Sequence, residues 1–192
     1  MTILNVFTEQ DAQEILRTDD TARIAELLAP HGIRLEQWAS YRPLSPDADS
    51  DAIIDAYRAE VEKVCAEGGY RLVDVVRMNP DDSDPEWPAK ADEARRRFLN
   101  EHVHAEDEVR YFVEGRGCFY LHLGDRVYAV VCEAGDLMSV PANTTHWFDM
   151  GSRPEFCAIR FFEEPDGWIA DFTGSAISST IPTLDELVAT SS

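Results

Sequence analysis

Three histidines and one glutamate stand at spacings that suit a single transition-metal ion. His102, His104 and Glu108 are close neighbours in the sequence, and His146 follows 38 residues after Glu108. Side chains alternate between the two faces of an extended strand, so the imidazoles of His102 and His104 project from the same side. Glu108 can return to that side after a short turn. The sequence therefore predicts one metal centre with three imidazole ligands and one carboxylate ligand.

This cluster also fits two arrangements that hold no metal. Such residues on an acidic protein can form a surface group, or they can be polar residues hydrogen-bonded inside a barrel. Zinc with four protein ligands usually makes a closed structural site, whereas Fe(II), Ni(II), Co(II) and Mn(II) readily take six ligands. Two positions would then stay open for a substrate that binds through two atoms. We favour a reactive centre of this last kind.

The elements that must position these residues are mostly short strands. From Phe98 onward, short runs rich in β-forming residues alternate with glycine-containing turns, a pattern that is typical of an antiparallel sandwich or barrel. The runs that we expect to be strands cover residues 108–114, 118–123, 127–132, 137–140, 146–149 and 156–162.

The residues before Phe98 have a mixed pattern. Strands are expected over 2–7, 33–38 and 70–78. Helices are expected after the capping candidates at 19–21, over 51–68 as one helix, and over 89–97. We therefore expect a single domain over 1–192. It would consist of an α/β elaboration over about 1–97, a metal-binding barrel core over about 98–174 and a flexible tail over about 175–192. The tail would hold at most one short helix, over 183–189.

The charge of the chain limits its partners. Its 37 acidic and 17 basic residues give a formal net charge of −20, which repels phosphate backbones and anionic lipids alike. We therefore expect neither a nucleic-acid partner nor a membrane partner. An anionic small ligand would need a metal ion or local arginines to hold it.

The cysteines and the start of the sequence bear on the compartment. The four cysteines are widely spread without a C-x-x-C pair, and no signal peptide opens the sequence. We expect a cytoplasmic protein with free thiols.

Two motifs resemble those of the cupin superfamily. The first has the form His-x-His-x-x-x-Glu over residues 102–108, and the second has the form Gly-x5-Pro-x-Asn-x-x-His over residues 135–146. The chain departs from the usual cupin pattern where Arg96 and Asn143 replace glycine and Met150 replaces asparagine. The four ligand positions are intact.

A closer resemblance is to the acireductone dioxygenases of methionine salvage, which are cupins. The likeness runs from about residue 33 to residue 174 and is carried by long matching strings over 98–104, 107–113, 140–151, 158–162 and 167–170. The resemblance implies a mainly β fold, a cupin-type antiparallel β-barrel or jelly roll with a few peripheral α-helices.

The resemblance also implies the reaction. Members of this family cleave 1,2-dihydroxy-3-keto-5-methylthiopentene, called acireductone, with O2. With Fe(2+) the expected products are formate and 4-methylthio-2-oxobutanoate. With Ni(2+) they are formate, carbon monoxide and 3-(methylthio)propanoate. We expect a monomer with one of these ions per chain, and the ligand set by itself does not decide between them.

Three polar residues are candidates for catalysis. Arg110 lies two residues past Glu108, so on a continuing strand it shares the ligand face and could pair with the substrate's enolate oxygens, unless it forms a salt bridge at the rim. Arg160 stands among apolar residues, which argues against a purely solvated charge, but an outward-facing position stays open. The resemblance makes Asp107 the candidate base; an incidental surface carboxylate is the alternative. Glu101 could orient an imidazole.

Three aromatic residues match family positions that line a pocket for the methylthio tail of the substrate. They are Phe98, Phe148 and Trp168. Aromatic residues in a β-rich domain are often simply part of the core, and that alternative stays open for each.

Two other functions compete with this one. A different cupin dioxygenase would share the metal ligands and act on another enediol. A non-catalytic cupin that binds a metal or a ligand would consume no oxygen with any enediol.

Overall fold

The computed structural model describes residues 1–38, 42, 44–45 and 47–190. Most of its regular structure is β, and the strand pairs are antiparallel. The strands are β1 (Ile3–Thr8), β2 (Glu14–Thr18), β3 (Arg34–Gln37), β4 (Leu72–Met78), β5 (His102–Val103), β6 (Glu108–Leu123), β7 (Arg126–Glu133), β8 (Asp136–Val140), β9 (His146–Asp149), β10 (Phe156–Phe162) and β11 (Asp171–Phe172). The prediction of a mainly β, antiparallel fold is confirmed.

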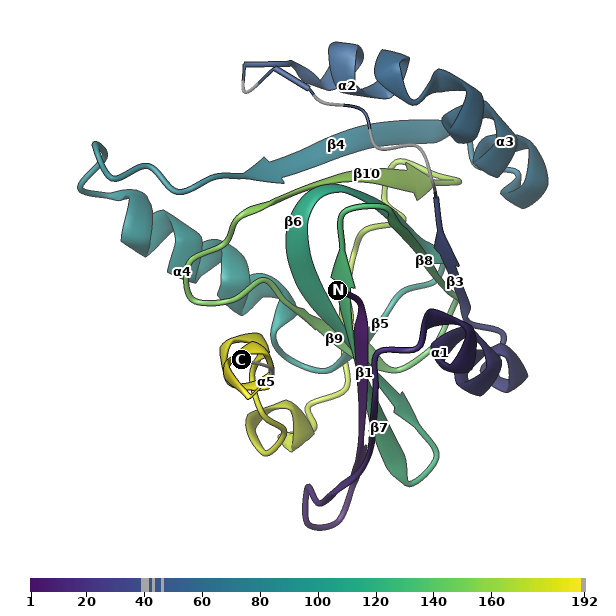
Figure 1. Cartoon of the computed structure of the whole chain (residues 1–192), viewed down its shortest axis with the longest axis vertical. Helices are drawn as coiled ribbons and strands as arrows, with labels where there is room; N and C mark the ends of the chain where they lie inside the picture. Colours follow the sequence, from purple (N-terminus) through teal and green to yellow (C-terminus); the bar gives the residue numbers. More distant parts are fainter. Residues whose placement is uncertain (39–41, 43, 46, 191–192) are drawn as a thin grey trace.

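The strands form two sheets that share β6 (Figure 1). One sheet has the order β11-β5-β9-β6-β7-β1-β2, and in the other β4 and β10 lie on one side of β6 and β8 and β3 on the other. The first half of β6 pairs with β8 and β10, and its second half pairs with β7 and β9. A single strand therefore passes from one sheet into the other.

The sequence prediction of two strands over 108–114 and 118–123 was wrong at this point. β6 is one strand of 16 residues, and the glycines at 115 and 117 lie within it. Gly115 has a φ of +67° and no room for a Cβ against the backbone of Glu155. A register shift between Cys157 and Ala158 of β10 faces the same place. Such a bulge bends a strand without ending it.

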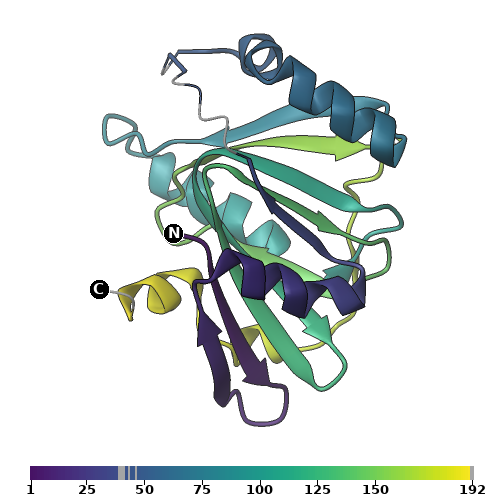
Figure 2. The ribbon, with the colours of Figure 1, turned by 45° about the vertical axis from the view of Figure 1, so that its right-hand side comes forward.

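Helices lie on the periphery (Figures 1 and 2). They are α1 (Thr21–Leu28), α2 (Ser50–Ala56), α3 (Arg58–Gly68), α4 (Trp87–Phe98) and α5 (Leu184–Ala189), with short 3-10 turns over Ala29–His31 and Ile177–Ser179. Of the three capping candidates at 19–21, it is Asp20 that caps α1 with its side chain. The helix expected over 51–68 is interrupted at Tyr57, whose backbone (φ −110°, ψ 20°) is not helical. Within the described residues no helix has the length and apolar character needed to cross a membrane.

Three apolar clusters hold these layers together. The largest lies between the two sheets and includes Phe112, Phe119 and Phe148. A second packs α2 and α3 onto the sheet that contains β4 and β10. A third joins the outer face of β6, β7 and β9 to the C-terminal segment.

The C-terminal segment differs from the loose tail that we expected. Ile177, Ile181, Leu184 and Leu187 are all buried against the barrel. The short helix expected over 183–189 is present as α5, and Thr183 closes a capping box at its start. Residues 191 and 192 lie outside the described part of the chain. From 177 to 187, the tail is thus packed onto the barrel.

Candidate metal centre

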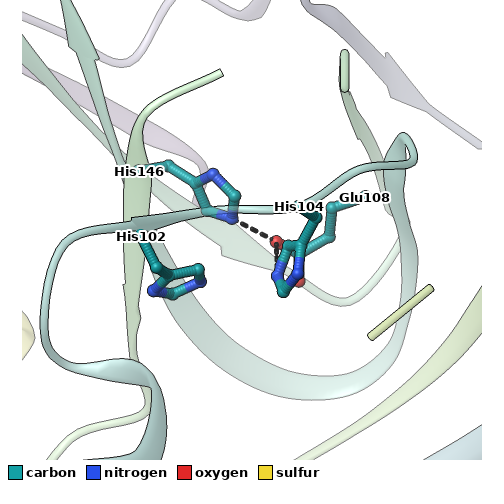
Figure 3. Close-up of side chains that lie close together, drawn as sticks. All are labelled: His102, His104, Glu108 and His146. Carbon is teal, nitrogen blue, oxygen red and sulfur yellow. Dashed lines mark hydrogen bonds and ion pairs between the residues drawn. The ribbon is translucent and has the colours of Figure 1, made fainter. Parts of the chain in front are cut away.

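The four predicted ligands converge in one cluster of side chains (Figure 3). His102 lies in β5, opposite His146 at the start of β9, and Glu108 begins β6. One potential ligand atom from each of the three histidines and from Glu108 lies within 4.8 Å of the others, and all four residues are buried. Strand pairing thus brings together side chains that are 44 residues apart in the sequence, from His102 to His146.

The ring of each histidine is oriented by a backbone carbonyl. Nδ1 of His102 lies 2.7 Å from the oxygen of Asn100, Nδ1 of His104 lies 2.8 Å from that of Ile169, and Nδ1 of His146 lies 2.7 Å from that of Thr144. A carbonyl accepts only from a protonated nitrogen, which assigns the proton to Nδ1 in each ring and leaves Nε2 to bind a metal. These three hydrogen bonds orient the rings as ligands of one ion.

The charges of the cluster are those that metal binding requires. Burial and neighbouring His146 lower the pKa of His102 to about 4, and burial also lowers the pKa of His104. Burial alone would raise the pKa of Glu108, but Arg110 and His146 outweigh it, so that pKa lies below its usual value. Neutral imidazoles at His102 and His104, beside an ionised carboxylate at Glu108, fit a divalent cation. The structure thus has one site for a divalent metal at His102, His104, Glu108 and His146.

Arg110 lies beside the ligands, where the strand phase places it. Its side chain is buried and forms an ion pair with Glu108. The guanidinium carbon also lies 4.5 Å from the centre of the Phe148 ring. Nε of Arg110 is buried and has no hydrogen-bond partner among the described residues. One donor of this arginine is therefore available for a ligand.

A narrow pocket adjoins the cluster; its cavity volume is about 10 Å³, about the room that one water molecule needs. It contains both expected arginines and combines polar groups with an apolar wall. The lining residues are Phe98, His104, Asp107, Glu108, Val109, Arg110, Arg160, Phe162, Gly167 and Trp168.

The three expected pocket aromatics are placed differently from one another. Phe98 and Trp168 line the pocket, and Trp168 is 54% exposed. Phe148 is not among the lining residues; it packs in the core, 5.0 Å from the ring centre of Phe119. The sequence reasoning missed Phe162, which follows Arg160 by two positions on β10 and therefore shares its face.

The carboxylate of Asp107 lies in the pocket with both oxygens engaged. Oδ1 accepts a hydrogen bond of 2.9 Å from the backbone N–H of Ala142, and Oδ2 accepts one of 3.2 Å from the hydroxyl of Tyr70. Burial, reinforced by Asp107, raises the pKa of Tyr70 to about 12, so the hydroxyl keeps its proton. These contacts hold Asp107 in one orientation.

Arg160 lies at the pocket and is also paired. Its Nε and Nη2 lie 2.8 and 2.7 Å from the two carboxylate oxygens of Asp74 on β4. Arg160 therefore lines the pocket and is also paired with Asp74.

Glu101 does not orient a ligand imidazole as expected. Its carboxylate accepts from Nδ1 of His122 at 2.6 Å and from the hydroxyl of Thr173 at 2.7 Å. It therefore ties β6 to the segment after β11.

Comparison with known proteins identifies relatives over nearly the whole chain. The model of the ARD/ARD' family matches residues 4–170. Acireductone dioxygenase 1 of Nocardia farcinica is 66% identical over 189 residues, which cover 98% of this chain and 100% of the relative. The acireductone dioxygenase of Saccharopolyspora erythraea is 50% identical over 190 residues, which cover 98% of this chain and 99% of the relative.

A solved structure gives the same result. The structure of an acireductone dioxygenase from Bacillus anthracis, with a cadmium ion in its active center, matches with a TM-score of 0.71 and 27% identity. The match covers 90% of this chain and 99% of that one. It confirms the expected cupin-type barrel. With its family model matched over 4–170 and close relatives along its full length, this chain belongs to the ARD/ARD' family.

Proposed function

We propose that this chain is a metal-dependent acireductone dioxygenase, which cleaves 1,2-dihydroxy-3-keto-5-methylthiopentene with O2. The observation that carries the proposal is the buried set of three histidines and one glutamate beside a pocket that holds Arg110. Its relatives in Nocardia and Saccharopolyspora carry the same name. The metal, when bound, supplies positive charge and Lewis acidity to an electron-rich substrate.

Arg110 binds the negative end of the substrate. The enediol of acireductone loses protons to become an anion, and a chain with a formal net charge of −20 repels anions. Arg110 brings a buried cation to the pocket, and its unpaired Nε can donate to an enolate oxygen. Arg160 adds a second cation at the wall, partly offset by Asp74.

Asp107 acts as the base that takes a proton from the enediol. Its two hydrogen-bond donors, Ala142 and Tyr70, hold the carboxylate toward the pocket before the substrate arrives. The rings of Phe98, Phe162 and Trp168 give the pocket an apolar wall for the methylthio tail.

The reaction needs no reductant from outside. One acireductone and one O2 together contain all the atoms of formate and 4-methylthio-2-oxobutanoate, which are the products with iron. The same atoms make formate, carbon monoxide and 3-(methylthio)propanoate, which are the products with nickel. The product with iron, 4-methylthio-2-oxobutanoate, is the 2-keto acid precursor of methionine, so the iron form would act in methionine salvage.

The protein works as a cytoplasmic monomer. One chain supplies all four ligands and the whole pocket lining, which supports activity without a second subunit. Its four cysteines are free, as thiols are in a reducing compartment.

Oxygen uptake tests the proposal. Protein freed of metal and reloaded with Fe(2+) or Ni(2+) should consume O2 when acireductone is added. The metal-free protein and a loaded sample without acireductone should consume none above the uncatalysed rate. Absence of uptake by fully loaded protein would refute the proposal and favour a non-catalytic cupin.

A further inference from the structure

The carboxylate of Glu106, which is not a metal ligand, joins the turn at residues 104–108, here called the metal turn, to a distant segment of the chain. Glu106 lies between His104 and Glu108, and its side chain reaches the residues that follow β10. Its Oε2 accepts a hydrogen bond of 2.8 Å from the backbone N–H of Glu163, and its Oε1 accepts one of 3.0 Å from that of Glu164. One carboxylate thus binds two consecutive backbone donors 57 and 58 residues away.

The same carboxylate lies against Gly167. A Cβ added at this glycine would overlap the carboxylate of Glu106. The φ of Gly167 is not in the positive range that strains other residues. A side chain at position 167 would therefore displace the Glu106 carboxylate and would not strain the backbone.

The segment 163–169 returns to the metal centre at its far end. The carbonyl oxygen of Ile169 lies 2.8 Å from Nδ1 of His104 and orients this ligand. Trp168, one residue earlier, lines the pocket. The metal turn and the segment are thus in contact twice, through the Glu106 carboxylate and through the His104 ring.

Little else holds the middle of this segment. Residues 163–166 are exposed, as are Trp168 and Ile169. Arg71 and Glu164 form an ion pair of 3.3 Å, but their side chains are 74% and 57% exposed, and such pairs contribute little. Strands β10 and β11 fix the two ends. Glu106, which is half-buried, holds the middle of the segment through its two hydrogen bonds to the backbone.

We propose that Glu106 is a positioning residue that clamps segment 163–169 against the metal turn, so that the Ile169 carbonyl holds His104 in its metal-binding orientation. The clamp also keeps Trp168 at the pocket. This inference rests on the proposed function only in that it assigns the four-ligand site to a metal.

Two variants test the clamp from opposite sides. Glu106→Gln keeps the size of the side chain but turns one acceptor into a donor that faces a backbone N–H. Gly167→Ala leaves Glu106 in place and pushes its carboxylate off the two amides. Glu163→Gln is the matched control, because it removes one exposed negative charge from the same segment and keeps the backbone N–H.

Three measurements on these proteins use metal alone, without acireductone. In both clamp variants, hydrogen exchange at the amides of Glu163 and Glu164 in metal-free protein should become at least about 10-fold faster. The dissociation constant for Ni(2+) should rise by about 10-fold to 100-fold, as is usual when a contact that orients a ligand is lost. The visible spectrum of Co(2+)-loaded protein should change, since His104 is reoriented.

The control should match the wild-type protein in all three measurements. Wild-type exchange and Ni(2+) affinity in Glu106→Gln would overturn the proposal. So would equal weakening in Glu163→Gln, because the effect would then come from charge alone. Because acireductone is absent from these measurements, their outcome does not depend on the outcome of the oxygen-uptake test of the proposed function.

Discussion

Arg110 and Glu108 lie two residues apart on β6, and their buried side chains form an ion pair. The side chains are 7% and 8% exposed. Oε2 of Glu108 also lies 2.6 Å from Nε2 of His146. The Glu108 carboxylate therefore contacts both another metal ligand, His146, and the cation that lines the pocket, Arg110. Strand alternation places Glu108 and Arg110 on one face of β6, and the fold brings His146 of β9 to the same carboxylate.

This relationship predicts different losses at the two positions. Arg110→Ala should lower kcat/KM for acireductone by about 100-fold or more, because a charge that faces the substrate is removed. Its metal content should fall much less than that of a ligand variant, since four ligands remain. Arg110→Lys should recover only part of the activity, because an ammonium lacks the planar fork. Arg153→Ala, at an exposed salt bridge with Asp82, serves as the control. Metal loss as severe as in a ligand variant would contradict the role of Arg110.

Removal of one ligand should abolish tight metal binding. His104→Ala should weaken Ni(2+) affinity by more than about 100-fold, beyond the effect usual for a contact that only orients a ligand. Isothermal titration would measure the affinity, and chelation should lower the melting temperature of the wild type only. His31→Ala is the matched control, because His31 packs near Tyr128 and away from the site. Full metal occupancy in His104→Ala would exclude the proposed ligand set.

The stability of the metal-free protein should depend on the protonation of His102. Its pKa is lowered to about 4, against about 6.5 in an unfolded chain. Between these values the unfolded chain binds a proton that the folded chain does not, so acid favours unfolding. The contribution of His102 is fully present above about pH 6.5 and is lost as the pH falls toward about 4, by at most about 3 kcal/mol.

Urea unfolding at several pH values would measure this dependence. His102→Gln should lose the part of the slope that falls between about pH 6.5 and pH 4. Identical slopes in the two proteins would show that His102 is not held neutral.

The packed tail gives a prediction about stability. Leu184 is 3% exposed, so Leu184→Ala should lower the free energy of unfolding by about 2 to 4 kcal/mol. Ile15, which is 44% exposed, provides the control, and Ile15→Ala should cost less than about 1 kcal/mol. Denaturant unfolding of metal-loaded protein would compare them. An unchanged free energy in Leu184→Ala would mean that the tail is loosely attached after all.

Side-chain identities and spacing were enough to predict the ligands. The alternation of His102 and His104, the return of Glu108 and the strand at His146 are local patterns. Strand phase extended them to Arg110, and the family resemblance extended them to the pocket aromatics. The carbonyls of Asn100, Thr144 and Ile169 could not be found in this way, because every residue has a carbonyl and only the fold decides which one meets a ring.

The wrong predictions have physical causes too. Glycines at 115 and 117 indicate a turn by composition, but pairing with neighbours on both sides keeps β6 extended through them. The tail was predicted to be loose because it is rich in serine and threonine. It also has four apolar residues at helix-like intervals from Ile177 to Leu187, and these pack against the barrel. Phe148 and Trp168 matched the family equally well, and only burial against Phe119 separates core from pocket.

The most direct test of metal-controlled dioxygenase activity is product analysis of one preparation loaded with two metals. Protein freed of metal is divided, reloaded with Fe(2+) or Ni(2+), and given acireductone and O2, and the gases and acids are quantified. We predict formate from both samples, with 4-methylthio-2-oxobutanoate from the iron sample and carbon monoxide with 3-(methylthio)propanoate from the nickel sample. Identical products from two active samples would contradict metal control of the reaction, and no products from either would contradict the dioxygenase assignment itself.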